Sequence, residues 1–273
     1  MKCVLHTKVM VDKSVVRLAT VPTDGPPLFQ GCSAVYLDFG LNLGLNLERL
    51  YEPERFTRRA GSIPKFEPTH SMHRIFGNTS EERAGVCAAG FEPNQVHAPR
   101  LRALKRRLAV GGRRVHIFGA AITADASMPN MTYWTDMAAH NRQNGETGNS
   151  LLRWAGSMDP AHSVAVPTVH FEWFLRRHLE GARAARVVVK MDVEGSEYSV
   201  LPPAIRSGAL CHSVDLLLLE KHDRFFKASW RGHNPAFGTD MSGPHALDAA
   251  LSDIRTGRTA DRCRTNLKVV DFP

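Results

Sequence analysis

A short apolar run that ends in an aspartate and a glycine-rich turn constrains this fold most. Residues 33–39 form the run, and Gly40, Asn42 and Gly44 follow it, with a helix expected to about residue 50. Glycine lets the backbone turn sharply and approach a ligand closely, and the first N–H groups of a helix lack intrahelical partners. The pattern predicts a buried strand, a turn and a helix. A ligand-binding turn and a tight turn without a ligand both fit it.

Further apolar runs of strand length alternate with helix-like segments along the chain. We expect strands at 85–91, 114–121, 185–191, 214–219 and 266–272. Helices are expected at 96–110, at 167–179, where Pro167 and Thr168 would open the helix, and at 245–255. This alternation predicts an α/β fold with a mostly parallel central sheet. We interpret 1–30 as an N-terminal extension and 31–273 as one domain, with insertions at about 51–83 and 125–160 that lie over the site.

Acidic residues end several of the expected strands. Ligands of parallel sheets bind outside the carboxyl ends of the strands, so Asp38, Glu92, Asp192 and Glu220 are predicted to share one rim. A carboxylate such as Glu92 can accept both hydroxyls of a ribose. Asp38, just before the turn, would repel a pyrophosphate and attract an amino group. These charges favour S-adenosylmethionine over NAD as the ligand.

Four short segments at or near the ends of the expected strands form a set of motifs, namely DFGLNLG at 38–44, FEPN at 91–94, KMDVEGSE at 190–197 and LEKH at 219–222. Together they resemble the motifs of the FkbM-type methyltransferases, in particular a eukaryotic methyltransferase-like branch. The resemblance implies a Rossmann-like class I methyltransferase fold with helices on both faces of the sheet. It also implies methyl transfer from S-adenosylmethionine, often to a hydroxyl oxygen. Cofactor-binding roles are expected for Asp38, Gly40, Asn42, Gly44, Glu92 and Asp192.

Methyl transfer to a hydroxyl requires a group that accepts the hydroxyl proton. We favour His222 as this base because its reference pKa is about 6.5, and Asp192 and Glu194 are the other candidate catalytic residues. His222 could instead be an ordinary loop histidine, and Glu194 could merely favour a helix N-terminus. The acceptor is expected to be a small molecule or a glycan. Two other functions stay open, namely an NAD-dependent oxidoreductase and a non-catalytic binding module with a methyltransferase fold.

The net charge of +8 indicates an acidic partner only weakly. Many basic residues lie within 100–114, where Leu101, Leu104 and Leu108 recur at helical spacing, which indicates an amphipathic helix with a basic outer face. A plain solvated face and a patch for an anion or nucleic acid both fit this pattern. No aromatic residues are interleaved for base stacking, so we expect no nucleic-acid partner.

No apolar run is long enough to cross a membrane. No group of His, Asp and Glu has metal-ligand spacing, so we expect no required metal. The oligomeric state stays open.

The cysteines are scattered and odd in number. None of them has the Cys-x-x-Cys spacing that is typical of zinc and redox sites. We therefore expect no disulfide framework and a reducing compartment, the cytoplasm. The five residues are Cys3, Cys32, Cys87, Cys211 and Cys263.

Overall fold

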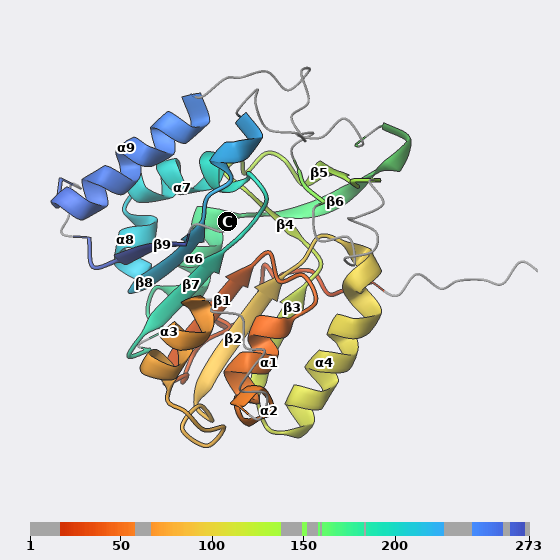
Figure 1. The fold of residues 1–273 in the computed structure, drawn as a ribbon, viewed down its shortest axis with the longest axis vertical. Coiled ribbons are helices and arrows are strands. Elements are labelled where there is room, and N and C mark those ends of the chain that lie inside the picture. Colours follow the sequence, from red (N-terminus) through yellow and green to blue (C-terminus); the bar gives the residue numbers. More distant parts are fainter. Residues whose placement is uncertain are drawn as a thin grey trace, which may run out of the picture.

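A six-stranded parallel sheet forms the centre of the molecule. The computed structural model describes residues 17–57, 67–137, 149–151, 158, 160–182, 184–226, 242–258 and 263–270. The strand order is β3-β2-β1-β7-β8-β9, and every pair is parallel (Figure 1). Its strands are β1 (Ala34–Phe39), β2 (Val86–Phe91), β3 (Arg114–Phe118), β7 (Val187–Met191), β8 (Leu216–Glu220) and β9 (Asn266–Val270). The predicted α/β fold with a mostly parallel sheet is confirmed.

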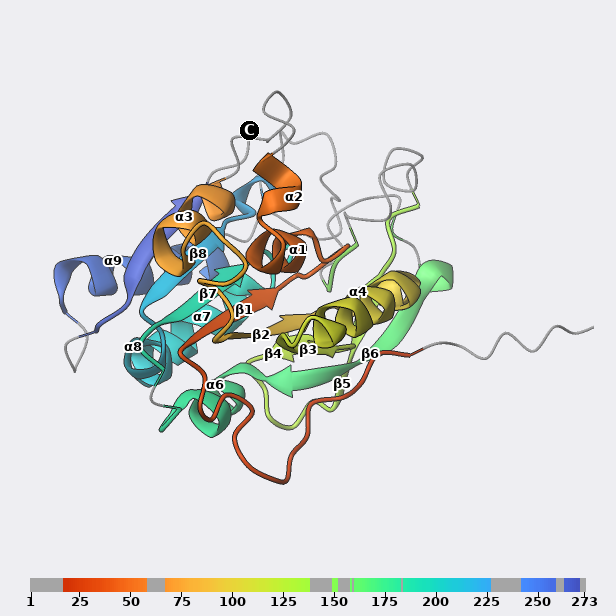
Figure 2. The same ribbon diagram turned by 90° about the horizontal axis from the view of Figure 1, so that it is seen from below.

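Helices cover both faces of this sheet. Tyr36 of β1 packs into a core with α1, α3 and α4, whereas Val35, Leu37 and Phe39 face a second core that includes α6 to α9. Figure 2 shows α1 and α3 on one side of β1 and α6 on the other. Burial on both faces explains the almost continuous apolar sequence of the central strands. These helices are α1 (Leu45–Tyr51), α3 (Glu67–Phe76), α4 (Ala98–Val110), α6 (Phe171–Leu179), α7 (Glu197–Arg206), α8 (Ala209–Ser213) and α9 (Ser242–Thr256).

A second, three-stranded sheet lies beside the carboxyl ends of the central strands. It consists of β4 (Ala121–Thr123), β6 (Ser163–His170) and β5 (Asn130–Trp134), in that spatial order with β6 in the middle. The helix predicted to start at Pro167 is wrong in its first turn, because Pro167 and Thr168 belong to β6. Pro167 lies where β6 changes partner from β5 to β4, so its missing N–H costs no ladder bond. The helix begins after His170, whose ring accepts a hydrogen bond from the backbone N–H of Trp173 at 3.2 Å.

The predicted N-terminal extension and insertions are partly described. Phe29 is fully buried in the core, and Gly119 N–H donates to the carbonyl of Ala19 at 2.9 Å. The first insertion contains α2 (Glu54–Thr57) and α3. The insertion ends at Arg83, whose fully buried side chain donates to the carbonyls of Arg49 and Leu50, each at 2.9 Å. The domain boundaries and the lid role remain predictions.

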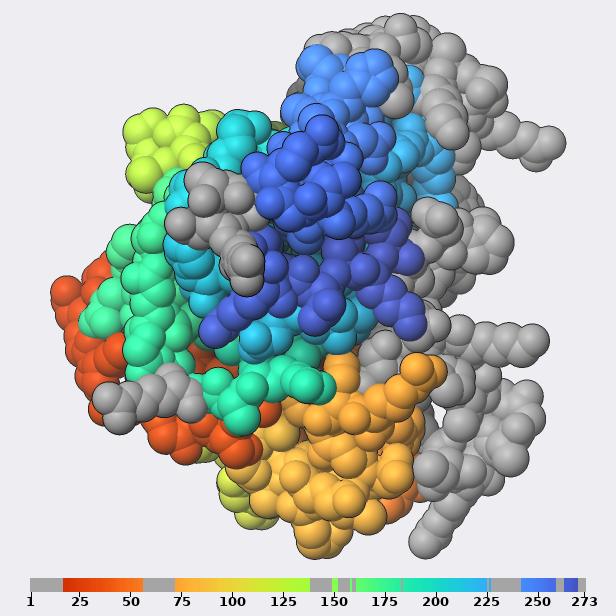
Figure 3. Space-filling model, turned by 90° about the vertical axis from the view of Figure 1, so that its left-hand side faces the viewer, coloured from red at the N-terminus to blue at the C-terminus, as the bar shows by residue number. Residues whose placement is uncertain are grey.

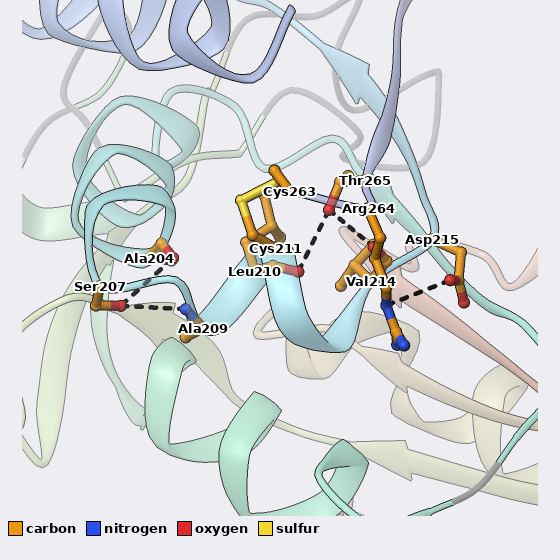
Figure 4. The surroundings of a disulfide bond; sticks show 10 residues. All are labelled: Ala204, Ser207, Ala209, Leu210, Cys211, Val214, Asp215, Cys263, Arg264 and Thr265. Carbon is orange, nitrogen blue, oxygen red and sulfur yellow. Dashed lines mark hydrogen bonds and ion pairs between the residues drawn. A yellow bond between two sulfur atoms is a disulfide. The ribbon is translucent and has the colours of Figure 1, made fainter. Parts of the chain in front are cut away.

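Two disulfides overturn the expectation that the chain has none. Cys32, just before β1, bonds to Cys87 in β2, with Cα atoms 5.8 Å apart. Cys211 of α8 bonds to Cys263, which leads into β9, with Cα atoms 4.5 Å apart (Figure 4). The partners are 55 and 52 residues apart in sequence, so only the fold brings them together. Cys3 lies outside the described residues. The cytoplasmic location was expected because the cysteines were expected to form no disulfides. The two disulfides remove that support.

The second disulfide lies where the C-terminal segment joins the sheet. Thr265, next to it, donates to the carbonyl of Val214 at 2.8 Å, and Arg264 forms an ion pair with Asp215 at 3.3 Å (Figure 4). In the space-filling view of Figure 3 the blue segment of α9 and β9 lies at the surface on this side.

None of the described helices is long and apolar enough to cross a bilayer.

Candidate functional site

A cleft opens at the carboxyl ends of β1, β2 and β7. The cleft holds about 600 Å³ of empty space, a volume that includes open solvent. The register of the sheet brings Phe39, Phe91 and Met191 side by side, so the residues that follow each strand meet here. The predicted site residues that line the cleft are Gly40, Asn42, Glu92, Asp192 and Glu194.

The glycines of the turn have different structural roles. Gly40 has φ +82°, and a Cβ there would lie 1.6 Å from the carbonyl oxygen of Asp192. Only glycine permits this close approach of the backbones after β1 and β7. Gly44 has φ +79° and lies outside the cleft, where a Cβ would lie 2.5 Å from a methyl carbon of Leu104. Gly44 therefore allows α1 to pack against α4, and its predicted contact with cofactor remains untested.

Glu92 connects the glycine turn to the end of β2. Its carboxylate accepts hydrogen bonds from the backbone N–H of Asn42 at 2.6 Å and of Asn94 at 2.8 Å. Burial nonetheless raises the pKa of Glu92 to about 7, because these bonds and the charge of Lys190 offset only part of the desolvation cost. Asn42 has φ +53°, and its buried Oδ1 has no hydrogen-bond partner among the described residues. Asn42 is one of the residues that line the cleft.

Asp38 lies behind the turn and does not line the cleft. It is fully buried, and its Oδ1 lies 3.4 Å from Nζ of Lys190. Lys190 also donates to the carbonyl of Gly40 at 3.0 Å and to Oδ2 of Asp192 at 2.9 Å. Burial raises the pKa of Asp38, with Lys190 opposing the shift. For Lys190 burial acts to lower the pKa, but the charges of Asp192 and Asp38 raise it overall.

Sequence reasoning missed this role of Lys190. The residue was visible only as the first letter of the KMDVEGSE segment, and nothing in the segment showed which acids it would join. A direct contact between Asp38 and a ligand amino group remains a prediction.

His222 lies at the centre of a carboxylate cluster beside the cleft. Its Nδ1 lies 2.9 Å from Oε1 of Glu197, and both side chains are fully buried. Its Nε2 lies 3.7 Å from Asp192, 3.5 Å from Glu194 and 3.6 Å from Glu220, in each case from a carboxylate oxygen. Burial acts to lower the pKa of His222, but the charges of Glu197 and Glu194 raise it to about 10. With this pKa His222 is protonated at neutral pH, and an imidazolium has no free lone pair to accept a proton. The raised pKa therefore argues against His222 as the base, and the role of His222 remains a prediction.

The two glutamates of the KMDVEGSE segment do not act as a pair on one helix face. Glu194 precedes α7, has φ +49°, and lines the cleft. Glu197 begins α7 and also accepts a hydrogen bond from the backbone N–H of Gly195 at 2.8 Å. Nothing in the sequence indicated the contact between Glu197 and His222, and a catalytic role of Glu194 remains a prediction.

The opposite wall of the cleft comes from the second sheet and the segment after it. Tyr133 of β5 and residues 149–151 lie there, within the predicted insertion. Ser150 donates to the carbonyl of Glu194, which ties this wall to the acidic side. Ser196 is also a lining residue, and its buried Oγ has no partner among the described residues. The polar sequence of 125–160 carried no signal that would identify these residues individually.

The basic face of α4 is partly neutralised by neighbouring acids. Arg107 lies 2.7 Å from Glu48 and 3.0 Å from Glu52, and Arg100 lies 3.6 Å from Glu48. These pairs connect α4 to α1 and the residue after it. The expected lack of a nucleic-acid partner remains a prediction.

Comparison with known proteins relates the chain to one family. Residues 72–246 match the model of the methyltransferase FkbM domain. The match includes Glu92, the KMDVEGSE segment and His222, and it begins after the glycine turn at 38–44. No curated protein matches the chain.

Proposed function

The chain belongs to the FkbM methyltransferase family, and from this we propose that it transfers the methyl group of S-adenosylmethionine to a hydroxyl oxygen of a small molecule or glycan. The observation that carries the proposal is the acidic cleft beside the glycine turn. Among its described lining residues, the carboxyl and imidazole side chains are those of Glu92, Asp192, Glu194 and His97. Three carboxylates suit a ligand with ammonium and sulfonium charges and oppose a pyrophosphate, which supports S-adenosylmethionine rather than NAD.

The residues around the turn fit this cofactor. The orphaned Oδ1 of Asn42 can accept from a polar N–H or O–H group, and the Glu92 carboxylate keeps lone pairs beyond its two backbone bonds for ribose hydroxyls. Gly40 lines the cleft next to them, and its lack of a side chain lets the backbone of Asp192 approach the turn. Gly40, Asn42, Glu92 and Asp192 would hold the cofactor, which supplies an electrophilic methyl group on a sulfonium.

The protein has to position the acceptor and remove its proton. In the transfer, the acceptor oxygen bonds to the methyl carbon, the carbon–sulfur bond breaks, and the hydroxyl proton leaves. Glu194 lines the cleft, whereas His222 is fully buried behind it, so Glu194 is the group that can contact the acceptor. We assign to Glu194 the role of the base that accepts the hydroxyl proton, and to Asp192 and His222 the role of orienting the Glu194 carboxylate. Holding the reactants in line away from water supplies the remainder of the rate enhancement.

A small polar acceptor agrees with the chemistry of the far wall. The hydroxyls of Tyr133 and Ser150 and the amide of Asn149 belong to lining residues there, and Ser196 lines the cleft on the acidic side. Such groups bind the hydroxyls of a sugar or a polar small molecule. A glycan end or a small alcohol is therefore the acceptor class to be screened.

Calorimetric titration tests the cofactor directly. We expect S-adenosylhomocysteine to bind the purified protein and NAD not to bind. Asn42→Ala should weaken binding, whereas Glu180→Gln, at an exposed position on α6's C-terminal end, should not. Binding of NAD alone would overturn the proposal. Isotope-labelled S-adenosylmethionine and a panel of glycosides and small alcohols then test transfer, and Glu194→Gln should reduce turnover far more than it reduces cofactor affinity.

A further inference from the structure

We propose that Asp192, Glu194 and His222 bind a divalent metal ion of the manganese-to-zinc series at the edge of the cleft. This proposal replaces the sequence-based expectation that no metal is required. It concerns a binding site and does not depend on the identity of the methyl acceptor or on methyl transfer itself.

The spacing of the side chains is the first argument. One ligand atom from each of the three residues lies within 4.8 Å of the other two. Nε2 of His222 lies 3.7 Å from Oδ1 of Asp192 and 3.5 Å from Oε2 of Glu194. Around a tetrahedral ion with bonds of about 2.1 Å, neighbouring ligand atoms are about 3.4 Å apart. Direct hydrogen bonds are shorter, at about 2.7–3.2 Å. These separations therefore fit ligands that share an ion.

The contacts behind the ligands are the second and independent argument. Metal-binding histidines almost always donate their other ring N–H to a carboxylate or a carbonyl, which fixes the ring orientation. Glu197 has this position, 2.9 Å from Nδ1 of His222, and it also accepts from the His222 backbone N–H at 3.0 Å. Both side chains are fully buried. Glu197 thus holds the ring so that Nε2 faces Asp192 and Glu194.

Asp192 is oriented in the same way. Lys190 donates to its Oδ2 at 2.9 Å, and its Oδ1 faces His222. Each of these two ligands therefore has one atom bound to a buried supporting residue and another directed into the cluster. Without an ion, a salt bridge of imidazolium and carboxylates explains the charges of the cluster. An ion bound at Nε2 would take the place of the imidazolium proton, so binding should release that proton.

The donor atoms indicate the class of ion. One imidazole nitrogen with carboxylate oxygens and no sulfur suits Mn²⁺, Fe²⁺ or Zn²⁺, whereas Mg²⁺ and Ca²⁺ prefer sites made of oxygen alone. Glu220 lies next to this group, with Oε1 3.6 Å from Nε2 of His222. Asp192 and Glu194 line the cleft, so an ion between them can be reached by a bound molecule, as in catalytic metal sites.

Titration of EDTA-treated protein with Mn²⁺, followed by the electron paramagnetic resonance signal of free Mn²⁺, tests the site. We expect one bound ion per chain, displaced by Zn²⁺. Glu194→Gln and His222→Gln should each weaken binding at least tenfold, and Glu197→Gln should weaken it by about 10–100-fold through the lost support of the ring. The exposed variant Glu180→Gln should bind as the parent does.

Three results would overturn the proposal. The first is that the folded parent protein does not bind Mn²⁺ or Zn²⁺ at millimolar concentration. The second is that Glu194→Gln and His222→Gln leave the binding unchanged. The third is that the protein binds only Mg²⁺ or Ca²⁺. Circular dichroism establishes that the variants are folded, and Glu194→Gln decides the test if His222→Gln does not fold. Titration of the EDTA-treated protein with S-adenosylhomocysteine is a separate measurement, so failure of the metal site and failure of the proposed function are distinguishable.

Discussion

Replacing Glu92 by glutamine should separate what this carboxylate does for stability from what it does for binding. Burial raises its pKa from 4.5 to about 7. The native state therefore keeps the proton over a range in which the unfolded state has already released it, and stability falls as pH rises from about 4.5 to about 7. A shift of this size corresponds to about 3 kcal/mol, which is fully lost above pH 7.

Glutamine resembles the protonated form of Glu92. It keeps one oxygen to accept from Asn42 or Asn94, but its amide nitrogen cannot accept the second backbone N–H bond. The variant should therefore lack the loss of stability between pH 4.5 and 7. Relative to the parent, Glu92→Gln should gain about 3 kcal/mol in unfolding free energy between pH 4.5 and pH 8.

Urea denaturation of both proteins at pH 4.5 and pH 8, followed by circular dichroism, measures this difference. Glu180→Gln, at an exposed position, is the matched control. At pH 8 the Glu92→Gln variant should also bind S-adenosylhomocysteine at least tenfold more weakly, because a charge-assisted hydrogen bond contributes about 1.5–3 kcal/mol. If the stability difference between variant and parent is the same at both pH values, the buried charge of Glu92 is not costly and the reasoning fails.

Three further predictions follow from individual contacts. Gly40→Ala should lower the unfolding free energy by more than about 3 kcal/mol, because the new Cβ would meet the Asp192 backbone. The control Gly112→Ala, where φ is +73° and the space is open, should lower it by only about 1–2 kcal/mol. Equal losses in urea denaturation would contradict the close-approach argument. Thiol titration of the denatured, unreduced protein should find one free cysteine, Cys3, and Cys211→Ala should lower stability by about 2–4 kcal/mol; five reactive thiols without reductant would show that the disulfides do not form. Arg83→Met should cost about 3 kcal/mol or more, because it leaves the carbonyls of Arg49, Leu50 and Gly77 without their buried donor, and an unchanged denaturation midpoint would refute this role.

The central sheet could be predicted because its strands carry an unambiguous signal. Strands buried on both faces are largely apolar, as in 187–191, where Lys190 is the one charged residue, and helices such as α4 have leucines at regular spacing. The strands of the second sheet were missed because β5 is short and polar and β6 contains a proline. In β6 the change of pairing partner removes the usual penalty of that proline, and no local pattern shows this.

The site was predictable as a location more than as a set of roles. The rule for parallel sheets predicted Asp38, Glu92, Asp192 and Glu220 at one rim, where the cleft lies. Glu92 and Asp192 line the cleft, whereas Asp38 and Glu220 do not. Which acid is paired depends on side chains from other strands, as with Lys190 and Asp38. The disulfides could not be predicted for the same reason, because each joins cysteines more than 50 residues apart.

The pairing of β1 with β7 also sets the order of events during synthesis. Phe39 and Met191 are register partners although about 150 residues separate them, and the cleft exists only when they meet. Neither disulfide spans this gap, since one lies within 32–87 and the other within 211–263. At about 5–20 residues per second, a ribosome needs many seconds to extend the chain from β1 to β7. A ligand of the cleft therefore cannot assist the folding of the nascent N-terminal half, and it acts only once β7 has left the ribosome.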